Sequence, residues 1–377
     1  MHLTAPTAAL RAAAKACAPA VSGHPTMPIL AGVHLDGADG VLSTRAFDHE
    51  TNVVSKLAVK VETPGVALVS HRLLTQVLSV ATTATVDLVL EDTRLRLVSG
   101  RAAWRLPLMT VDAYPLPLGT VAPLGDVDGE EFHAAVERVV TAASYDGVTL
   151  DIPLHATYLG LNVDTLTLVA TDKYQMHTAV VPFRRSSEDA TPFVLVPAGR
   201  LHAVTRTLTD GRVTVGVSEN RLSLADGTTA VTTALAAAKG GTWVNWQALF
   251  TGFTSDKTHR YQFNRDELLT TLKQAATLAD VQASKARHVT LTITTADALV
   301  QAASGVDGDA AVPLATTGYD APEPLVWTVN ADYLTSAVHA ADADPVQFTQ
   351  QSPKHPVGIG PVGEPATQSV MPIRKAV

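Results

Sequence analysis

The sequence predicts an α+β fold made of three tandem copies of one domain, each with two helices packed on antiparallel sheets. The first observation behind this prediction is a pair of short strands with alternating apolar residues and a tight turn between them. The pair occurs three times, at 33–48, 159–170 and 291–302. Alternation of this kind is typical of a β-hairpin with one buried face.

The second observation is a constant spacing between landmarks of different kinds. Val213 follows Val86 by 127 residues, Pro197 follows Ser70 by the same number, and Val346 follows Val213 by 133. Solenoid repeats are about 50 residues or shorter, so a period this long indicates tandem domains. The expected domains are residues 1–124, 125–254 and 255–377.

The elements follow one order in each third: helix, hairpin, strand, helix, hairpin. In the first third they are expected at 4–18, 33–48, 66–69, 71–78 and 86–97. The second third repeats them at 130–143, 159–170, 194–196, 197–208 and 213–224, and the last at 265–279, 291–302, 325–329, 331–340 and 346–359. Ser70 and Asn330 are suitable N-caps. The Pro- and Gly-rich stretch 111–129 predicts a linker, and 240–259 a second loose segment with four aromatic residues.

Composition narrows the class of protein. The 377 residues carry a net charge of -8, which argues against a basic coat for nucleic acid but allows a basic stripe on one face. The single cysteine, Cys17, rules out a disulfide framework. No apolar run approaches the length of a membrane span and no leader precedes the first helix, so we expect a soluble cytoplasmic protein.

Motifs for catalysis, metals or cofactors are not visible. Residues 358–363 spell G-x-G-x-x-G, but Pro361 and Pro365 forbid the helix that dinucleotide binding needs, so a glycine-rich hairpin turn is the better interpretation. The stretch 47–50, F-D-H-E, does not predict a metal site, because successive strand residues point to opposite faces. We therefore expect no cofactor, no metal and no enzymatic activity.

Basic residues recur on the helices of each third: Arg11, Lys15, Arg72, Arg138, Arg200, Arg206, Arg265 and Lys273. Each alone is typical of a solvated helix face, and their recurrence favours phosphate contact. The apolar C-terminus, Val370-Met371-Pro372-Ile373, is open to two interpretations. It is either a last edge strand or part of a groove with Tyr174 and Met176.

Three short motifs give the chain a resemblance to a known family. Residues 24–30, H-P-T-M-P-I-L, resemble R-P-T-L-P-I-L of the bacterial DNA polymerase III β subunit, the replication sliding clamp. Residues 169–172 match its V-A-T-D, and 370–374 resemble its V-M-P-M-R terminus. The motifs stand in the family's order on a triplicated framework that spans the whole chain.

This resemblance implies that two three-domain chains join head to tail into a ring whose helices surround double-stranded DNA. Contacts from Lys and Arg to phosphates are independent of sequence, so such a ring slides and is retained by closure. The implied DNA-contacting residues are Arg11, Lys15, His24, Arg72, Arg138, Arg200, Arg206 and Lys273, with His24 in place of a family arginine. The implied homodimer interface includes Trp104 and Leu278; an ordinary core position is the alternative for Trp104.

The resemblance also implies a hydrophobic cleft for short apolar peptides of partner proteins. These partners are the DNA polymerase III α subunit, the clamp loader, other polymerases, and repair or ligation factors. The implied cleft residues are Thr171, Lys173, Tyr174, Gln175, Met176, Val244, Leu249, Val370, Met371, Pro372, Ile373 and Arg374. Residues 173–176, K-Y-Q-M, replace the usual G-H-R-L, and Val244 replaces a common proline. A specialised paralogue with altered partner or inhibitor binding is one alternative, and a tandem-domain peptide-binding scaffold that does not bind DNA is another.

Overall fold

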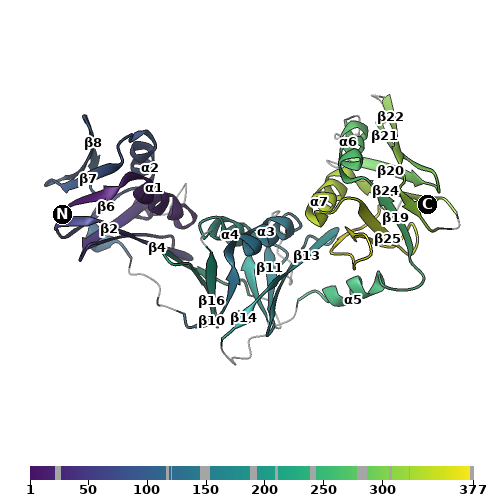
Figure 1. Cartoon of the computed structure of the whole chain (residues 1–377), viewed down its shortest axis with the longest axis horizontal. Helices are drawn as coiled ribbons and strands as arrows, with labels where there is room; N and C mark the ends of the chain where they lie inside the picture. The colour runs from purple at the N-terminus through teal and green to yellow at the C-terminus, as the bar shows by residue number, and fades with distance from the viewer. Residues whose placement is uncertain are drawn as a thin grey trace. The chain divides into compact units, whose positions relative to one another are not determined.

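The computed structural model describes residues 1–21, 27–115, 119, 121–144, 153–186, 193–208, 211–237, 243–277, 287–304, 308–321 and 323–373. The chain divides into two compact units. The first comprises residues 1–133, 161–166 and 181–236, and the second residues 134–160, 167–180 and 237–377. Helices pack beside antiparallel strands in both units (Figure 1), which confirms the predicted α+β class.

The first unit contains two antiparallel sheets. The smaller has the order β5-β1-β7-β8-β9, formed by Lys60–Thr63, His2–Pro6, Thr85–Leu90, Arg94–Ser99 and Ala102–Pro107. The larger has the order β14-β10-β16-β17-β18-β4-β3-β2-β6, formed by Arg184–Arg185, Pro123–Asp128, Arg212–Ser218, Arg221–Ala225, Thr229–Ala234, Thr51–Ala58, Val41–Phe47, Gly32–Ala38 and Gly65–Ser70. The pairing of Val231 with Val53 shows how this sheet joins distant parts of the sequence.

Helices α1 (Thr7–Ala16) and α2 (His71–Val80) pack against each other in the first unit. Their apolar residues recur at helical spacing, and Leu10, Leu74 and Leu78 are fully buried. The strand β15 (Phe193–Pro197) leads into α4 (Ala198–Thr205). Short 3-10 turns lie at Ala18–Ala20, Pro28–Ala31 and Val111–Ala113.

Helix α3 (Gly129–Val140) begins in the first unit and continues in the second. One sheet of the second unit includes the order β11-β12-β13-β27-β26-β25-β19-β23, formed by Ala156–Leu161, Thr165–Thr171, Gln175–Pro182, Gln368–Val370, Val357–Pro361, Val346–Gln350, His259–Phe263 and Gly318–Tyr319. The other has the order β22-β21-β20-β24, formed by Gly308–Ala315, Asp297–Ser304, His288–Ile293 and Leu325–Asn330.

Three helices complete the second unit: α5 (Trp246–Gly252), α6 (Arg265–Ala276) and α7 (Ala331–Ala341). The core between α6, α7 and the sheets is centred on Tyr261, Phe263 and Phe348, which are fully buried and in mutual ring contact. As predicted, Asn330 caps α7, because its side chain accepts a hydrogen bond from Asp332 N at 2.8 Å.

Several sequence expectations were wrong in detail. The first helix starts at Thr7, because the residues before it form β1. Ser70 is the N-cap residue of α2 as predicted, although its side chain makes no capping hydrogen bond. The expected linker 111–129 contains β10, and the expected loose segment 240–259 contains α5. The glycine-rich stretch 358–363 forms β26 and the turn after it, as the hairpin interpretation predicts.

Candidate functional site

The C-terminal segment is the last strand of a sheet and then a short tail. Strand β27 lies between β13 and β26, with Val370 opposite Gln175, so it is not an edge strand. Beyond it, Met371 N donates to Tyr174 O at 2.7 Å and Ile373 N donates to Thr328 O at 2.7 Å. We call residues 171–176 together with 370–373 the tail site. The structure therefore places Tyr174 beside Met371. Of the two interpretations of the C-terminus, this agrees with the one that places it next to Tyr174 and Met176.

A tight turn leads into β13 and fixes the tail site. Asp172 Oδ1 accepts from the backbone N–H groups of Tyr174 at 2.8 Å and Gln175 at 2.9 Å. Thr171 Oγ1 donates to Gln175 O at 2.6 Å and accepts from Lys173 N. Lys173 has a φ of 84°, in the left-handed region that favours glycine. The turn therefore keeps a glycine-type backbone although a lysine stands there.

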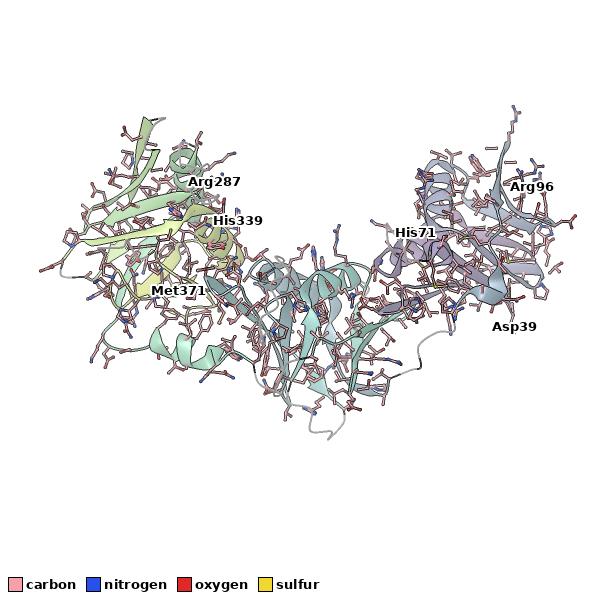
Figure 2. The ribbon with its side chains drawn as sticks, turned by 180° about the vertical axis from the view of Figure 1, so that it is seen from behind. Asp39, His71, Arg96, Arg287, His339 and Met371 are labelled. Atoms are coloured by element: carbon pink, nitrogen blue, oxygen red, sulfur yellow. The ribbon has the colours of Figure 1, made fainter. Side chains whose placement is uncertain are left out.

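The tail site exposes apolar side chains next to the exposed Lys173. Tyr174 is 59% exposed, and its ring stacks on Tyr333 of α7 at a centroid distance of 6.2 Å. Met371 and Ile373 are half-buried, whereas Met176, Val370 and Pro372 are buried. Figure 2 labels Met371. Accessible aromatic and aliphatic side chains beside a fixed backbone suit the docking of a short apolar peptide.

Two buried polar side chains of β13 hold the end of α3. Gln175 Nε2 donates to Thr141 O at 3.3 Å, and His177 Nδ1 lies 3.1 Å from Arg138 O. Thr141 Oγ1 also lies 3.1 Å from Nδ1, while its own proton is donated to Arg138 O. Because the Arg138 carbonyl only accepts, the bond from His177 to it places the ring proton on Nδ1. Burial lowers the pKa of His177 to about 4, and the bond to Arg138 opposes that shift. The strand of the tail site and the last turn of α3 are therefore one bonded structure.

An aromatic series places α5 against the same sheet. Tyr158 of β11 stacks on Trp243 at 5.5 Å, and contacts continue from Trp246 to Phe250 and on to Phe253. A Cβ added at Gly358 of β26 would meet the Phe253 ring at 2.8 Å, so this close approach requires glycine. Val244 and Leu249 of the expected cleft lie before and within α5, and both are half-buried.

This aromatic packing was not predicted from the sequence. A signal was present, because Trp246, Phe250 and Phe253 are spaced four and three residues apart, which is the period of one helix face.

The expected DNA-contacting residues differ in how far they are already engaged. Arg11 Nε donates to Leu78 O at 2.9 Å and Arg11 Nη2 to Ala81 O at 3.0 Å, so this side chain holds the end of α2. Arg200 forms an ion pair with Glu50. The guanidinium Nε of Arg138 is buried.

Other expected contact residues are exposed, as Arg11 also is. Lys15, Arg72, Arg206 and Lys273 are exposed on α1, α2, the end of α4 and α6. Trp104 is half-buried on β9, which ends its sheet, and it pairs with Leu97. His24, Leu278 and Arg374 lie outside the described residues.

Among the described residues, no cluster of His, Cys, Asp and Glu is arranged to hold a metal ion. Within the same ranges, no helix is both long enough and apolar enough to cross a membrane.

Comparison with known families identifies two matching models. The DNA polymerase III beta subunit N-terminal domain matches residues 1–118, and the central domain of the same subunit matches residues 126–239. The beta sliding clamp of Micrococcus luteus is 32% identical over 191 residues, which are 51% of this chain and 61% of that protein. The clamp of Streptomyces coelicolor is 30% identical over 50% of each chain. The chain thus matches between half and three-fifths of the length of these relatives.

A longer match joins the chain to the beta sliding clamp homolog GriR of Streptomyces muensis, 27% identical over 86% of this chain and 84% of that protein. Solved structures agree in fold. The Bacillus subtilis DNA polymerase sliding clamp superposes over 100% of both chains with a TM-score of 0.87 and 19% identity. The Pseudomonas aeruginosa sliding clamp bound to griselimycin gives 0.88 and 20%, again over 100% of both chains.

Proposed function

The chain belongs to the DNA polymerase III beta subunit family, and from this premise we propose that it is a DNA sliding clamp. In this role it encircles duplex DNA, tethers a replicative polymerase and catalyses no reaction itself. The observation that carries the proposal is the joint match of two beta-subunit domain models with the sliding-clamp fold over the whole chain. We further propose that it works in the cytoplasm as three clamp domains, at 1–124, 125–254 and 255–377.

Ring closure needs two complementary surfaces on each chain, because a head-to-tail contact that closes makes a ring. Strands β9 and β22 each end a sheet and leave one row of backbone groups for pairing. Trp104 on β9 adds a half-buried aromatic side chain that dimerisation would cover. These features support a homodimer, with Trp104 and Leu278 as proposed interface residues.

DNA contact in the proposed ring comes from the helices. Exposed Lys15, Arg72, Arg206 and Lys273 supply charge with no base specificity, which suits sliding. Arg11, Arg138 and Arg200 contribute less to phosphate binding in this proposal, since the first and last already have partners and Arg138 is partly buried. His24 keeps its proposed role by resemblance.

Partner docking is proposed at the tail site, extended by Val244, Leu249 and Arg374. Its occupants would be short apolar peptides of the polymerase α subunit, the clamp loader, other polymerases, and repair or ligation factors. Exposed Tyr174 and half-buried Met371 supply the contact surface. Main-chain bonds on both sides of β27 keep that surface preformed, which lowers the ordering cost of binding.

The test is retention on DNA of two topologies. The chain is loaded onto nicked circular plasmid by its host's clamp loader and then isolated by gel filtration. A clamp stays on the circle and runs off after a single restriction cut. Equal retention on circular and linear DNA would contradict the proposal, and a monomer that does not associate with DNA would favour a peptide-binding scaffold.

A second candidate is a clamp specialised for altered partners or inhibitors. Residues 173–176 favour it, because a lysine with positive φ and an exposed tyrosine change the chemistry of the tail site. Griselimycin, the ligand named with the Pseudomonas aeruginosa clamp, is a direct probe. Specialisation predicts weak griselimycin binding by this chain and stronger binding when residues 173–176 are changed to G-H-R-L. Unchanged affinity would exclude these residues as the cause.

A further inference from the structure

A hollow of about 290 Å³ opens between α6 and α7 in the second unit. We call it the α6–α7 pocket. Leucine and alanine side chains of the two helices form its apolar part. Its polar lining consists of Thr270, Lys273, Arg287, Asp332, Thr335 and His339.

Two permanent cations face this pocket together with one carboxylate. Lys273 is exposed on α6, and Arg287 lies just before β20 (Figure 2). Arg287 Nε donates to Asp332 Oδ2 at 3.3 Å, and Arg287 Nη2 donates to Asp332 Oδ1. This pair orients the guanidinium and leaves Nη1 outside it. The lining therefore carries a net charge of one positive unit from Lys273, Arg287 and Asp332. Asp332 holds the Arg287 guanidinium in a fixed orientation.

His339 supplies a third N–H donor at the same pocket. Its Nδ1 lies 3.5 Å from Nη2 of Arg265. Because a guanidinium only donates, Nδ1 is the acceptor and the proton of the neutral ring is on Nε2. The contact with Arg265 therefore sets the tautomer of His339. Figure 2 shows Arg287 and His339 at neighbouring positions in this part of the second unit.

We propose that the α6–α7 pocket binds the phosphate group of a nucleotide-sized ligand through Lys273, Arg287 and His339. A guanidinium fork and an ammonium are the groups that recognise phosphate, the first by paired hydrogen bonds and the second as a point charge. The volume lies at the lower end of small-ligand pockets, about 300 Å³, and the apolar side suits a sugar or base. The inference concerns this pocket alone and does not require a ring.

The phosphate has two chemical sources, a free nucleotide or the backbone of DNA. Isothermal titration of the full chain at low salt with deoxyadenosine monophosphate, with deoxyadenosine, and with a short blunt duplex distinguishes them. The variants are Arg287→Gln, Lys273→Gln and Asp332→Asn. The matched control is Arg212→Gln in the first unit, since Arg212 is likewise exposed and paired with an aspartate, Asp126, at 3.1 Å.

The monophosphate should bind and deoxyadenosine should not. Arg287→Gln and Lys273→Gln should each weaken binding about tenfold, or about 1.4 kcal/mol. Asp332→Asn removes the negative charge of the pocket and keeps an amide oxygen that can accept from Arg287, so it should tighten binding, a gain that misfolding cannot produce. Arg212→Gln should match the wild type. Parallel loss of duplex affinity in Arg287→Gln would assign the pocket to DNA phosphates, and an unchanged duplex affinity to a free nucleotide. Equal heats for nucleotide and nucleoside, or equal behaviour of Arg287→Gln and Arg212→Gln, would overturn the proposal.

Discussion

His177 gives the second unit a defined response to pH. Its side chain is fully buried, its Nδ1–H bonds to Arg138 O, and its Nε2 is buried without a hydrogen-bond partner in the part of the chain that the structure describes. Protonation would place a second N–H group in this buried site. Burial accordingly lowers the pKa to about 4 from the usual 6.5.

The sign of the effect follows from proton uptake. Between pH 6.5 and pH 4 the unfolded chain binds a proton on this histidine and the folded chain does not, so stability falls as the pH falls through this window. At pH 5 the two pKa values correspond to a loss of about 2 kcal/mol relative to pH 7.5, and at pH 4 to about 3 kcal/mol. Both losses are large against the net stability of a domain.

The matched variant is His177→Asn, whose amide nitrogen takes the place of Nδ1 and does not titrate. Urea unfolding of both proteins at pH 7.5 and pH 5 is followed by tryptophan fluorescence, since Trp243, Trp246 and Trp327 belong to the second unit. The wild type should lose about 2 kcal/mol more than the variant over this interval. Identical losses in the two proteins would refute the assignment of the pH response to His177.

Four further predictions follow from named contacts. Tyr174→Ala combined with Met371→Ala should abolish partner-peptide binding, measured by fluorescence anisotropy, and leave the proposed dimer intact; unchanged affinity would mean that the tail site is not the docking surface. Lys173→Gly should raise the free energy of unfolding by about 1 kcal/mol because it relieves a positive φ, and a loss of stability would contradict this. Arg11→Ala should lower stability by about 1 kcal/mol by releasing two carbonyl groups at the end of α2, with Lys15→Ala as a neutral control in thermal unfolding. Trp104→Ala should shift the proposed dimer toward monomer in sedimentation, and an unchanged distribution would exclude Trp104 from the interface.

The short-range spacing of apolar residues predicted many of the helices and paired strands. The alternating strands and capped helices appear where short-range periodicity places them, as with Asn330 and α7. Strand β10 was missed because Pro123 and Gly125 resemble linker residues. The structure explains that glycine: an added Cβ at Gly125 would meet Phe183 at 2.4 Å, a contact that only the folded sheet creates.

The candidate site was harder to predict, because its geometry depends on distant pairing. The sequence left the C-terminus open between an edge strand and a groove wall, and only the pairing of Val370 with both Gln175 and Val357 decides that β27 is internal. The ion pair between Arg200 and Glu50 joins residues far apart in the chain, so helix position alone suggested a free cation. Side-chain partners of this kind leave no local signal.

A ring of two chains requires that this protein form a dimer in solution. Sedimentation equilibrium of the purified protein measures this directly. We predict a single species with twice the mass of the 39.6 kDa chain. A protein that remains monomeric at every concentration tested would contradict the account.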